Sequence, residues 1–373
     1  MPDSLKSRPS HDSTDPRRAG SLSLPLSLCL TVFVFACATL FAVAPVHAQA
    51  DKEKVRISIF SWPGYGFWFV AKEKNLAPDL DLDIRVIEDP YESFALMKAG
   101  RLDATSSTIE YGPLAAESGH PARIVTFANL SYGTDRIIVR PEVDQPADLK
   151  GEQVAVLEGG LSQIYTGIWL EQNGMKFDAV KYVNLIMDDA AAAMIGGNVA
   201  AGEFWEPFGS QVLKIVDDAR VVAQSNEPFW LETALLADTC YFHEDFIVER
   251  PEVAAKTLKA LYDAIDYWSK NTEEANRIIA ENLQFPVADV EAVIGTNGRF
   301  KEGGLYVYDL DEAARFMGVM DGDPPHGQSN GQIVDHFKLT NEWWKKFGLV
   351  EKMHDPSAGI DTSVIRKVVE MSE

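Results

Sequence analysis

The chain has little cysteine and no excess of positive charge, and each shortage argues against a class of protein. Its 373 residues include 3 Cys, and 34 Lys and Arg stand against 56 Asp and Glu, for a formal net charge of -22. A protein that binds duplex nucleic acid needs a basic face to neutralise phosphates. Nucleic acid and anionic membranes are therefore not expected as partners, and the charge suits a soluble protein.

Catalytic motifs are also scarce. The stretch 160–164 (GLSQI) lacks the last glycine of a G-x-S-x-G nucleophile elbow, and the stretch 64–66 lacks the third glycine of a dinucleotide-binding loop. No GxxxxGK[ST] phosphate loop occurs. The sequence therefore predicts a protein that is not an enzyme and has no cofactor.

The histidines and Cys240 do not predict a metal site. The seven His never reach metal-ligand spacing, and His326, His336 and His354, in polar segments, are expected at the surface. Cys240 lies in an apolar, strand-like stretch, where a small buried residue is expected rather than a nucleophile. No metal ligands are predicted.

Residues 1–50 have the pattern of a secretory signal peptide. Basic residues at positions 6, 8, 17 and 18 precede an apolar run from Leu22 to Ala44, and cleavage is expected after Ala48 or Ala50. This arrangement predicts export to the periplasm. A retained anchor is the alternative, because about 20 apolar residues can span a bilayer. Cleavage would leave Cys240 alone, so no internal disulfide is expected.

Two strand–loop–helix units recur about 100 residues apart. The first is a strand at 54–60, a glycine loop at 62–66 and a helix at 67–74; the second is a strand at 153–157, a loop at 158–160 and a helix at 161–173. A helix and strand at 91–106 likewise match those at 189–204. Two such arrays at a constant offset predict two α/β lobes of like topology, each built on a parallel sheet.

Loops at the carboxyl ends of these strands are the candidate ligand site, because open α/β sheets bind ligands there. Trp62 and Tyr65 present aromatic faces on a rigid loop. Gly160 and Ser162 open a helix whose free N–H groups suit an anion or an acceptor atom. Trp205 and Glu206 stand between a strand and the next helix.

The same residues resemble the nitrate/sulfonate/taurine-type periplasmic substrate-binding proteins of ABC transporters, a group that includes binders of thiamine-pyrimidine precursors. The similarity covers residues 55–285 and lies in the segments 62–65, 99–104, 131–135, 148–151, 158–159 and 205–207. The chain departs from the pattern at Asn75, which replaces a glycine, at Ala200, where Asp is common, and at Glu203, an added acid.

The resemblance implies a two-lobe α/β fold, the type II periplasmic-binding-protein fold. Each lobe is expected to hold a mainly parallel sheet flanked by helices, with the ligand cleft between them. After the signal peptide at 1–50, lobe 1 would comprise 51–138 plus 241–373, and lobe 2 would comprise 139–240. Ligand would close the lobes by hinge motion, and the expected monomer would deliver the solute to an ABC permease in the inner membrane.

The expected ligand residues are Trp62, Gly64, Tyr65, Ser107, Thr108, Asp135, Gly160, Ser162, Trp205 and Glu206. Trp62 and Tyr65 would stack on the ligand, and Ser107 and Thr108 would donate hydrogen bonds. The Gly160 N–H and Ser162 would hold a polar or anionic group, whereas Asp135 and Glu206 would accept hydrogen bonds or face a cation. Two ligand classes stay open: sulfonate, taurine or nitrate on one side, and an amino-pyrimidine or amidine on the other.

Two other functions also stay open. A receptor that signals to a membrane sensor would have the same sequence features as a transport receptor. An enzyme related to the eukaryotic pyrimidine synthase, which consumes its own cofactor and active-site residue, is the other alternative. That enzyme relies on a cysteine-rich segment and iron, whereas Cys240 is the one cysteine here after residue 50.

Overall fold

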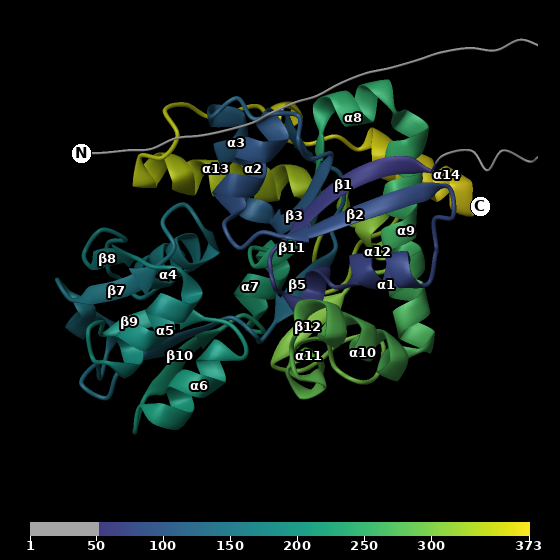
Figure 1. Cartoon of the computed structure of the whole chain (residues 1–373). Helices are drawn as coiled ribbons and strands as arrows, with labels where there is room; N and C mark the ends of the chain where they lie inside the picture. The colour runs from purple at the N-terminus through teal and green to yellow at the C-terminus, as the bar shows by residue number, and fades with distance from the viewer. Residues whose placement is uncertain (1–51) are drawn as a thin grey trace, which may run out of the picture. The chain divides into compact units, whose positions relative to one another are not determined.

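Two β-sheets with helices around them make up the part of the chain that the structure describes, residues 52–373 (Figure 1). This is a computed structural model. The signal peptide expected at residues 1–50 and its cleavage sites lie outside the described residues. Within residues 52–373, no helix has both the length and the apolar character needed to cross a membrane.

The first sheet has seven strands. Six follow the order β12-β5-β11-β3-β1-β2, and β4 pairs with β11. Their bounds are β1 Glu53–Ile59, β2 Leu80–Val86, β3 Ala104–Thr108, β4 Ala122–Ile124, β5 Asn129–Tyr132, β11 Ala237–His243 and β12 Gly304–Val307.

The second sheet has five strands, in the order β10-β6-β9-β7-β8. Their bounds are β6 Arg136–Val139, β7 Gln153–Val156, β8 Lys181–Asn184, β9 Ala201–Phe204 and β10 Arg220–Gln224.

The repeat expected from the sequence is present in both sheets. β1 lies between β3 and β2 and runs parallel to both, just as β7 lies parallel between β9 and β8. Each sheet also contains antiparallel pairs beside this parallel core: β11 is antiparallel to β3, β4 and β5, β12 to β5, and β6 to β9 and β10. The strands that run against the parallel core are thus β11 and β12 in the first sheet and β6 in the second, and the other strands run with it, as expected of mainly parallel sheets.

Helices flank both sheets, and in Figure 1 those around β7, β8 and β9 form a group apart from those around β1 and β2. The helices that follow strands of the first sheet or lie in the C-terminal part are α1 Phe67–Glu73, α2 Pro90–Lys98, α3 Gly112–Glu117, α8 Glu244–Glu249, α9 Pro251–Lys270, α10 Thr272–Leu283, α11 Val287–Ile294, α12 Leu310–Phe316, α13 Ile333–Phe347 and α14 Ser363–Ser372. Those between β7 and β11 are α4 Leu161–Gln172, α5 Met187–Ile195, α6 Phe208–Ile215 and α7 Pro228–Thr233. The short 3-10 helices are η1 Pro63–Tyr65, η2 Ile109–Tyr111, η3 Pro146–Leu149 and η4 Pro356–Ala358.

The chain passes from the first sheet to the second between Tyr132 and Arg136, and it returns between Gln224 and Ala237. The lobe boundaries expected near residues 139 and 240 stay a prediction, and the strands place both passages a few residues earlier. The second passage is bonded to the end of β5, since the Ser131 and Ser225 hydroxyls lie 2.6 Å apart. The Gly133 N–H also donates to the Ser225 hydroxyl, at 2.9 Å.

A substitution at Gly133 should show how tightly the first passage is packed. Gly133 has φ +106, and an added Cβ would lie 3.0 Å from the Cα of Gly303 and 2.9 Å from the Gln224 Nε2. Gly133→Ala should lower the free energy of unfolding by about 2 kcal/mol, because both strain and crowding oppose it. Gly119→Ala is the matched control: Gly119 has φ +62 and open space around it, so it carries backbone strain alone. Equal losses for the two variants in urea unfolding would contradict this reading.

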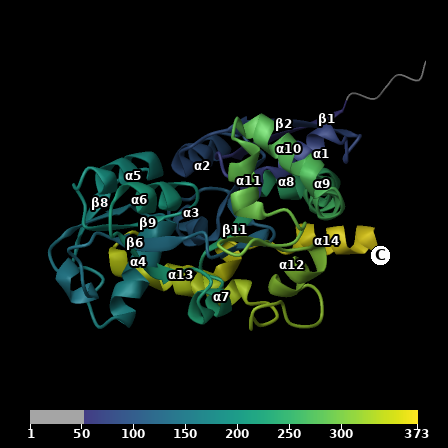
Figure 2. The ribbon, with the colours of Figure 1, turned by 90° about the horizontal axis from the view of Figure 1, so that it is seen from below.

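Helix α13 connects the two groups of helices and lies beside α4 in Figure 2. The Trp344 indole N–H donates to the Glu110 carbonyl at 2.7 Å, and Lys346 pairs with Glu171 of α4 at 2.6 Å. A Cβ on Gly167 of α4 would lie 2.7 Å from the Phe347 ring, so glycine lets the two helices approach closely. The C-terminal part of the chain is thus a third link between the sheets.

The surface position expected for His336 is wrong. Its side chain is 1% exposed, because the helical period places it on the same face of α13 as Ile333 and Trp344. Nε2 lies 3.4 Å from the Leu235 carbonyl oxygen, and burial lowers the pKa of His336 to about 4, so the ring is neutral. The expectation for Cys240 is confirmed: it is 1% exposed, and burial raises its pKa to about 12.

Candidate ligand site

A cavity of about 730 Å³ has walls from both sheets. Its lining includes Trp62 after β1, Thr108 at the end of β3 and Leu157 after β7. The carboxyl ends of the parallel strands therefore meet the cavity, as expected for open α/β sheets. The volume suits a small organic solute.

Aromatic side chains from both sides face the cavity. The Trp62 ring, next to β1, lies 6.5 Å from the Trp205 ring, next to β9, with 74° between the ring planes. Tyr91 and Tyr111 form a second edge-to-face pair with centroids 5.7 Å apart. Such rings offer flat apolar surface and a negative face to a ligand.

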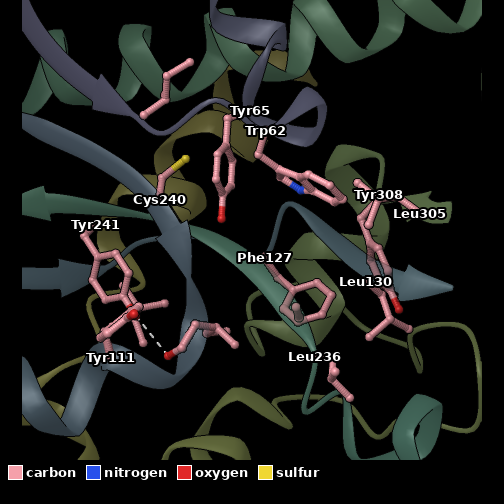
Figure 3. Packing of buried hydrophobic residues seen from close by; sticks show 14 of the residues in the cluster. Trp62, Tyr65, Tyr111, Phe127, Leu130, Leu236, Cys240, Tyr241, Leu305 and Tyr308 are labelled. Atoms are coloured by element: carbon pink, nitrogen blue, oxygen red, sulfur yellow. Dashed lines mark hydrogen bonds between the residues drawn. The ribbon is translucent and has the colours of Figure 1, made fainter. Parts of the chain in front are cut away.

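Trp62 is fixed in place by its own loop and by β11. Its indole N–H donates to Asp238 Oδ2 at 3.1 Å. A Cβ on Gly64 would lie 2.7 Å from the Trp62 Nε1 and 2.8 Å from Leu305, so glycine at this position leaves room for the indole. Figure 3 shows Trp62 and Tyr65 projecting from the same loop.

Asp238 holds both aromatic residues of that loop. The Tyr65 hydroxyl donates to Asp238 Oδ1 at 2.6 Å, in addition to the bond from Trp62. Burial raises the pKa of Asp238 to about 7, although the Tyr65 and Trp62 donors act in the opposite direction. Asp238 is thus both a wall of the cavity and the anchor of Trp62.

Removing the Tyr65 hydroxyl should weaken this anchor in a pH-dependent way. Tyr65→Phe should cost about 2 kcal/mol of unfolding free energy at pH near 8, where a carboxylate accepts the bond, and about 1 kcal/mol near pH 5. Tyr182→Phe is the control, because that hydroxyl donates to the neutral Phe177 carbonyl at 2.6 Å. Urea unfolding at both pH values measures the difference, and a pH-independent loss for Tyr65→Phe would refute the charged bond.

Two carboxyl groups meet on the second-sheet side. Glu203 on β9 is 1% exposed and Asp135, just before β6, is 5% exposed. Neither carboxyl oxygen of Glu203 has a hydrogen-bond partner among the described residues. Burial, and then the neighbouring Asp135, raises the pKa of Glu203 well above its usual range, and burial also raises that of Asp135.

The charged lining as a whole is acidic. Eight carboxyl groups face the cavity, and no Lys, Arg or His among residues 52–373 joins them. The eight are Glu88, Asp89, Asp135, Glu158, Asp188, Asp189, Glu203 and Asp238. Asp135, Glu203 and Asp238 are buried, whereas the other five are exposed at the rim.

Five of the ten residues expected at the site line the cavity, and five do not. Those that line it are Trp62, Thr108, Asp135, Ser162 and Trp205. Those outside its lining are Gly64, Tyr65, Ser107, Gly160 and Glu206. The direct ligand contacts expected of these ten residues stay a prediction.

Several of the expected polar groups already have partners within the protein. The Thr108 hydroxyl donates to Glu110 Oε1 at 2.7 Å, and the Ser162 hydroxyl accepts from the Leu157 N–H at 2.7 Å. The Gly160 N–H donates to the Leu157 carbonyl at 3.0 Å. Glu206 forms an ion pair with Arg136, and both side chains are 12% exposed. Glu206 is therefore neutralised by a neighbour on β6.

The cavity lining includes three notable residues that were not among the expected site residues: Asp238, Asn129 and Tyr111. A charged residue within an otherwise apolar strand, such as Asp238 in the segment 237–243, is the signal that could have marked it. Glu203 is the same kind of residue in β9. Within residues 52–373, no three His, Cys, Asp or Glu side chains are grouped as metal ligands would be.

Known proteins of similar structure include periplasmic binding proteins. The structure of the alkanesulfonate-binding protein SsuA from Xanthomonas axonopodis pv. citri, bound to MOPS, matches with a TM-score of 0.65 at 16% identity, over 84% of this chain and 99% of that one. A protein of Brucella abortus named as a binding protein is 26% identical over 224 residues, 60% of this chain and 69% of that protein. The taurine-binding periplasmic protein of Escherichia coli is 24% identical over 242 residues, 62% of this chain and 68% of that protein.

The two sheets with a cavity between them therefore form the fold of periplasmic binding proteins, as the sequence predicted. The model of the NMT1/THI5-like family matches residues 62–275, more than half of the chain. The chain belongs to this family.

Proposed function

We propose that the chain is the extracytoplasmic solute-binding component of an ABC importer. The observation that carries this proposal is the cavity of about 730 Å³ whose walls come from both sheets. The E. coli relative is named as a periplasmic binding protein, and the Brucella relative as a binding protein. Both names support binding without catalysis, and the E. coli name supports a periplasmic location.

Closure around the solute is the proposed mechanism. Trp62 and Trp205 stand on opposite walls, so a ligand that touches both is held best when the sheets approach each other. A ligand shifts such an equilibrium by its difference in affinity between the open and closed forms. The passages near Gly133 and Ser225 are the proposed hinge. A permease that recognises the closed form would then accept the solute, and the protein would act as a monomer.

A binding screen with the segment 51–373 tests this function. A panel of sulfonates, taurine, nitrate, amidines, guanidine and amino-pyrimidines is scored by thermal unfolding. A compound at about 100 times its dissociation constant should add about 2.7 kcal/mol of stability. The shift should be lost in Trp205→Ala and kept in Trp343→Ala, a control tryptophan on α13 outside the cavity lining. No shift with any compound, or a shift that survives Trp205→Ala, would contradict the proposal.

A further inference from the structure

The cavity wall has one sign of charge, and this restricts the ligand. The three buried carboxyls of Asp135, Glu203 and Asp238 lie deep in the wall, and five more carboxyls lie at the rim. Among residues 52–373, no Lys, Arg or His side chain lines the cavity to pair with an anion. The wall is therefore suited to positive charge.

One buried side chain in the wall lacks the donors that it needs. No N–H or hydroxyl group of the described residues donates to either carboxyl oxygen of Glu203, whose neighbour is the Asp135 carboxyl. Glu203 is 1% exposed and lines the cavity. Buried polar groups in proteins are nearly always hydrogen-bonded. Unpaired acceptors at the wall of a cavity indicate a ligand that brings the donors.

The nearest guanidinium does not remove this demand for positive charge. Arg136, next to Asp135 in the chain, donates to Glu206 rather than to Glu203. The local group thus contains three carboxyls, on Asp135, Glu203 and Glu206, and one guanidinium. Asp135 and Glu203 therefore form no ion pair of their own among the described residues.

Two of the three helix ends at the cavity are offset by their own carboxyl groups. Helix N-termini attract anions, and α2, α4 and α5 begin near the lining residues. Asp89 accepts from the Tyr91 N–H at 2.9 Å, and Asp188 stands in the first turn of α5, whereas α4 has no acidic residue in its first turn. The carboxylates of Asp89 and Asp188 offset the positive ends of α2 and α5.

We infer that the ligand is an organic cation with N–H donors, an amidinium, guanidinium or protonated amine, held at Glu203 and Asp135. Its apolar part lies against the Trp62 and Trp205 rings, whose faces also attract a cation. This inference rests on the solute-binding function proposed above and selects one of the ligand classes that the sequence left open. Charged donors on carboxylates form the stronger hydrogen bonds of proteins.

Pairs of probes that differ in charge and little in shape test the inference. Benzamidinium is compared with benzoate, and methylguanidinium with methanesulfonate, by isothermal titration calorimetry on the segment 51–373 at low salt. We expect at least one cation to bind and neither anion to bind. Glu203→Gln, which keeps the shape of the side chain, should weaken cation binding by at least about tenfold. Glu158→Gln, which removes an exposed rim carboxyl, should weaken it less than about threefold.

The outcomes separate the charge of the ligand from the function of the protein. Binding of an anion without either cation would overturn the inference and leave solute binding intact. Cation binding that is unchanged in both Glu203→Gln and Asp135→Asn would overturn the placement at the carboxyl pair. No binding of any of the four probes at about 10 mM, far above the concentrations at which such receptors are useful, would overturn the inference and count against the proposed function too. Thermal unfolding of each variant shows that it is folded.

Discussion

Raising the pH from about 6.5 to about 8 is expected to lower the free energy of unfolding of the ligand-free protein by about 3 kcal/mol. The cause is a set of buried carboxyls that keep their protons in the folded state. Burial raises the pKa of Glu110 to about 8 and that of Asp238 to about 7, and it raises the pKa of Glu203 as well. The ordinary values are 4.5 for Glu and 3.8 for Asp.

The sign follows from the number of bound protons. Above pH 4.5 the unfolded chain has released these protons while the folded protein still holds them, so stability falls as the pH rises, by about 1.4 kcal/mol per pH unit and group. The fall continues until the pH passes the folded-state pKa of each group. The buried His336, whose pKa is lowered to about 4, has the opposite effect below pH 6.5. Stability is therefore compared only from pH 6.5 upward.

Urea unfolding at pH 6.5, 7, 7.5 and 8 measures this dependence of the free energy of unfolding on pH. Glu110→Gln should make the fall of stability with pH shallower by the contribution of about one proton, and the variant should be more stable than the wild type at the highest pH. Its side chain lies outside the cavity lining, with Oε1 bonded to Thr108 and Oε2 unpaired. Glu273→Gln, an exposed change on α10, is the control. A wild-type stability that rises over this range would refute the prediction.

The sequence was sufficient for the parallel core of each sheet because that core depends on local patterns. Alternating strands, glycine loops and helices at a constant offset near 100 residues are properties of neighbouring residues, and the structure has them in β1–α1 and β7–α4. The loops at the strand ends were predictable for the same reason. Trp62 and Trp205 could thus be placed at opposite walls before any geometry was known.

The mixed sheets and the deep wall of the cavity depend on contacts between distant residues. Trp62 and Asp238 are 176 positions apart, and Arg136 and Glu206 are 70 apart. No periodicity links such pairs, so Glu206 was expected to face the ligand although Arg136 neutralises it. Asp238 is a polar residue in a buried strand, and its role emerges only when β11 is placed beside the Trp62 loop. Long-range pairing therefore decides which charges the ligand meets.

The affinity for benzamidinium, the cation probe, is expected to rise with pH between about 6 and 8, by up to about tenfold per pH unit where one proton is released on binding. The buried Glu203–Asp135 pair holds a proton when no ligand is present, because both carboxyls are buried and Asp135 disfavours ionisation of Glu203. An amidinium keeps its charge over this range and pairs with the ionised form. Binding must therefore release a proton, and a lower pH opposes it.

Calorimetry in two buffers of different ionisation enthalpy counts the released protons, and we expect about one. Other charged or titratable groups that act on the pair are Arg136, Glu110, Tyr165 and Asp238. Glu203→Gln should weaken binding and also flatten its pH dependence. A wild-type affinity that does not change from pH 6 to pH 8, within about twofold, would contradict the shared proton.

The two pH effects can be separated because they arise from different carboxyls. Glu110→Gln should reduce the slope of stability against pH and leave the slope of affinity unchanged, since Glu110 lies outside the cavity lining. Glu203→Gln should reduce both slopes. The Glu203 carboxyl destabilises the ligand-free protein, and it is also the group that pairs with the bound cation. If Glu110→Gln flattened the affinity profile as strongly as Glu203→Gln, the proton released on binding would come from Glu110. In that case the position of the cation would have to be assigned again, next to η2 rather than next to β9.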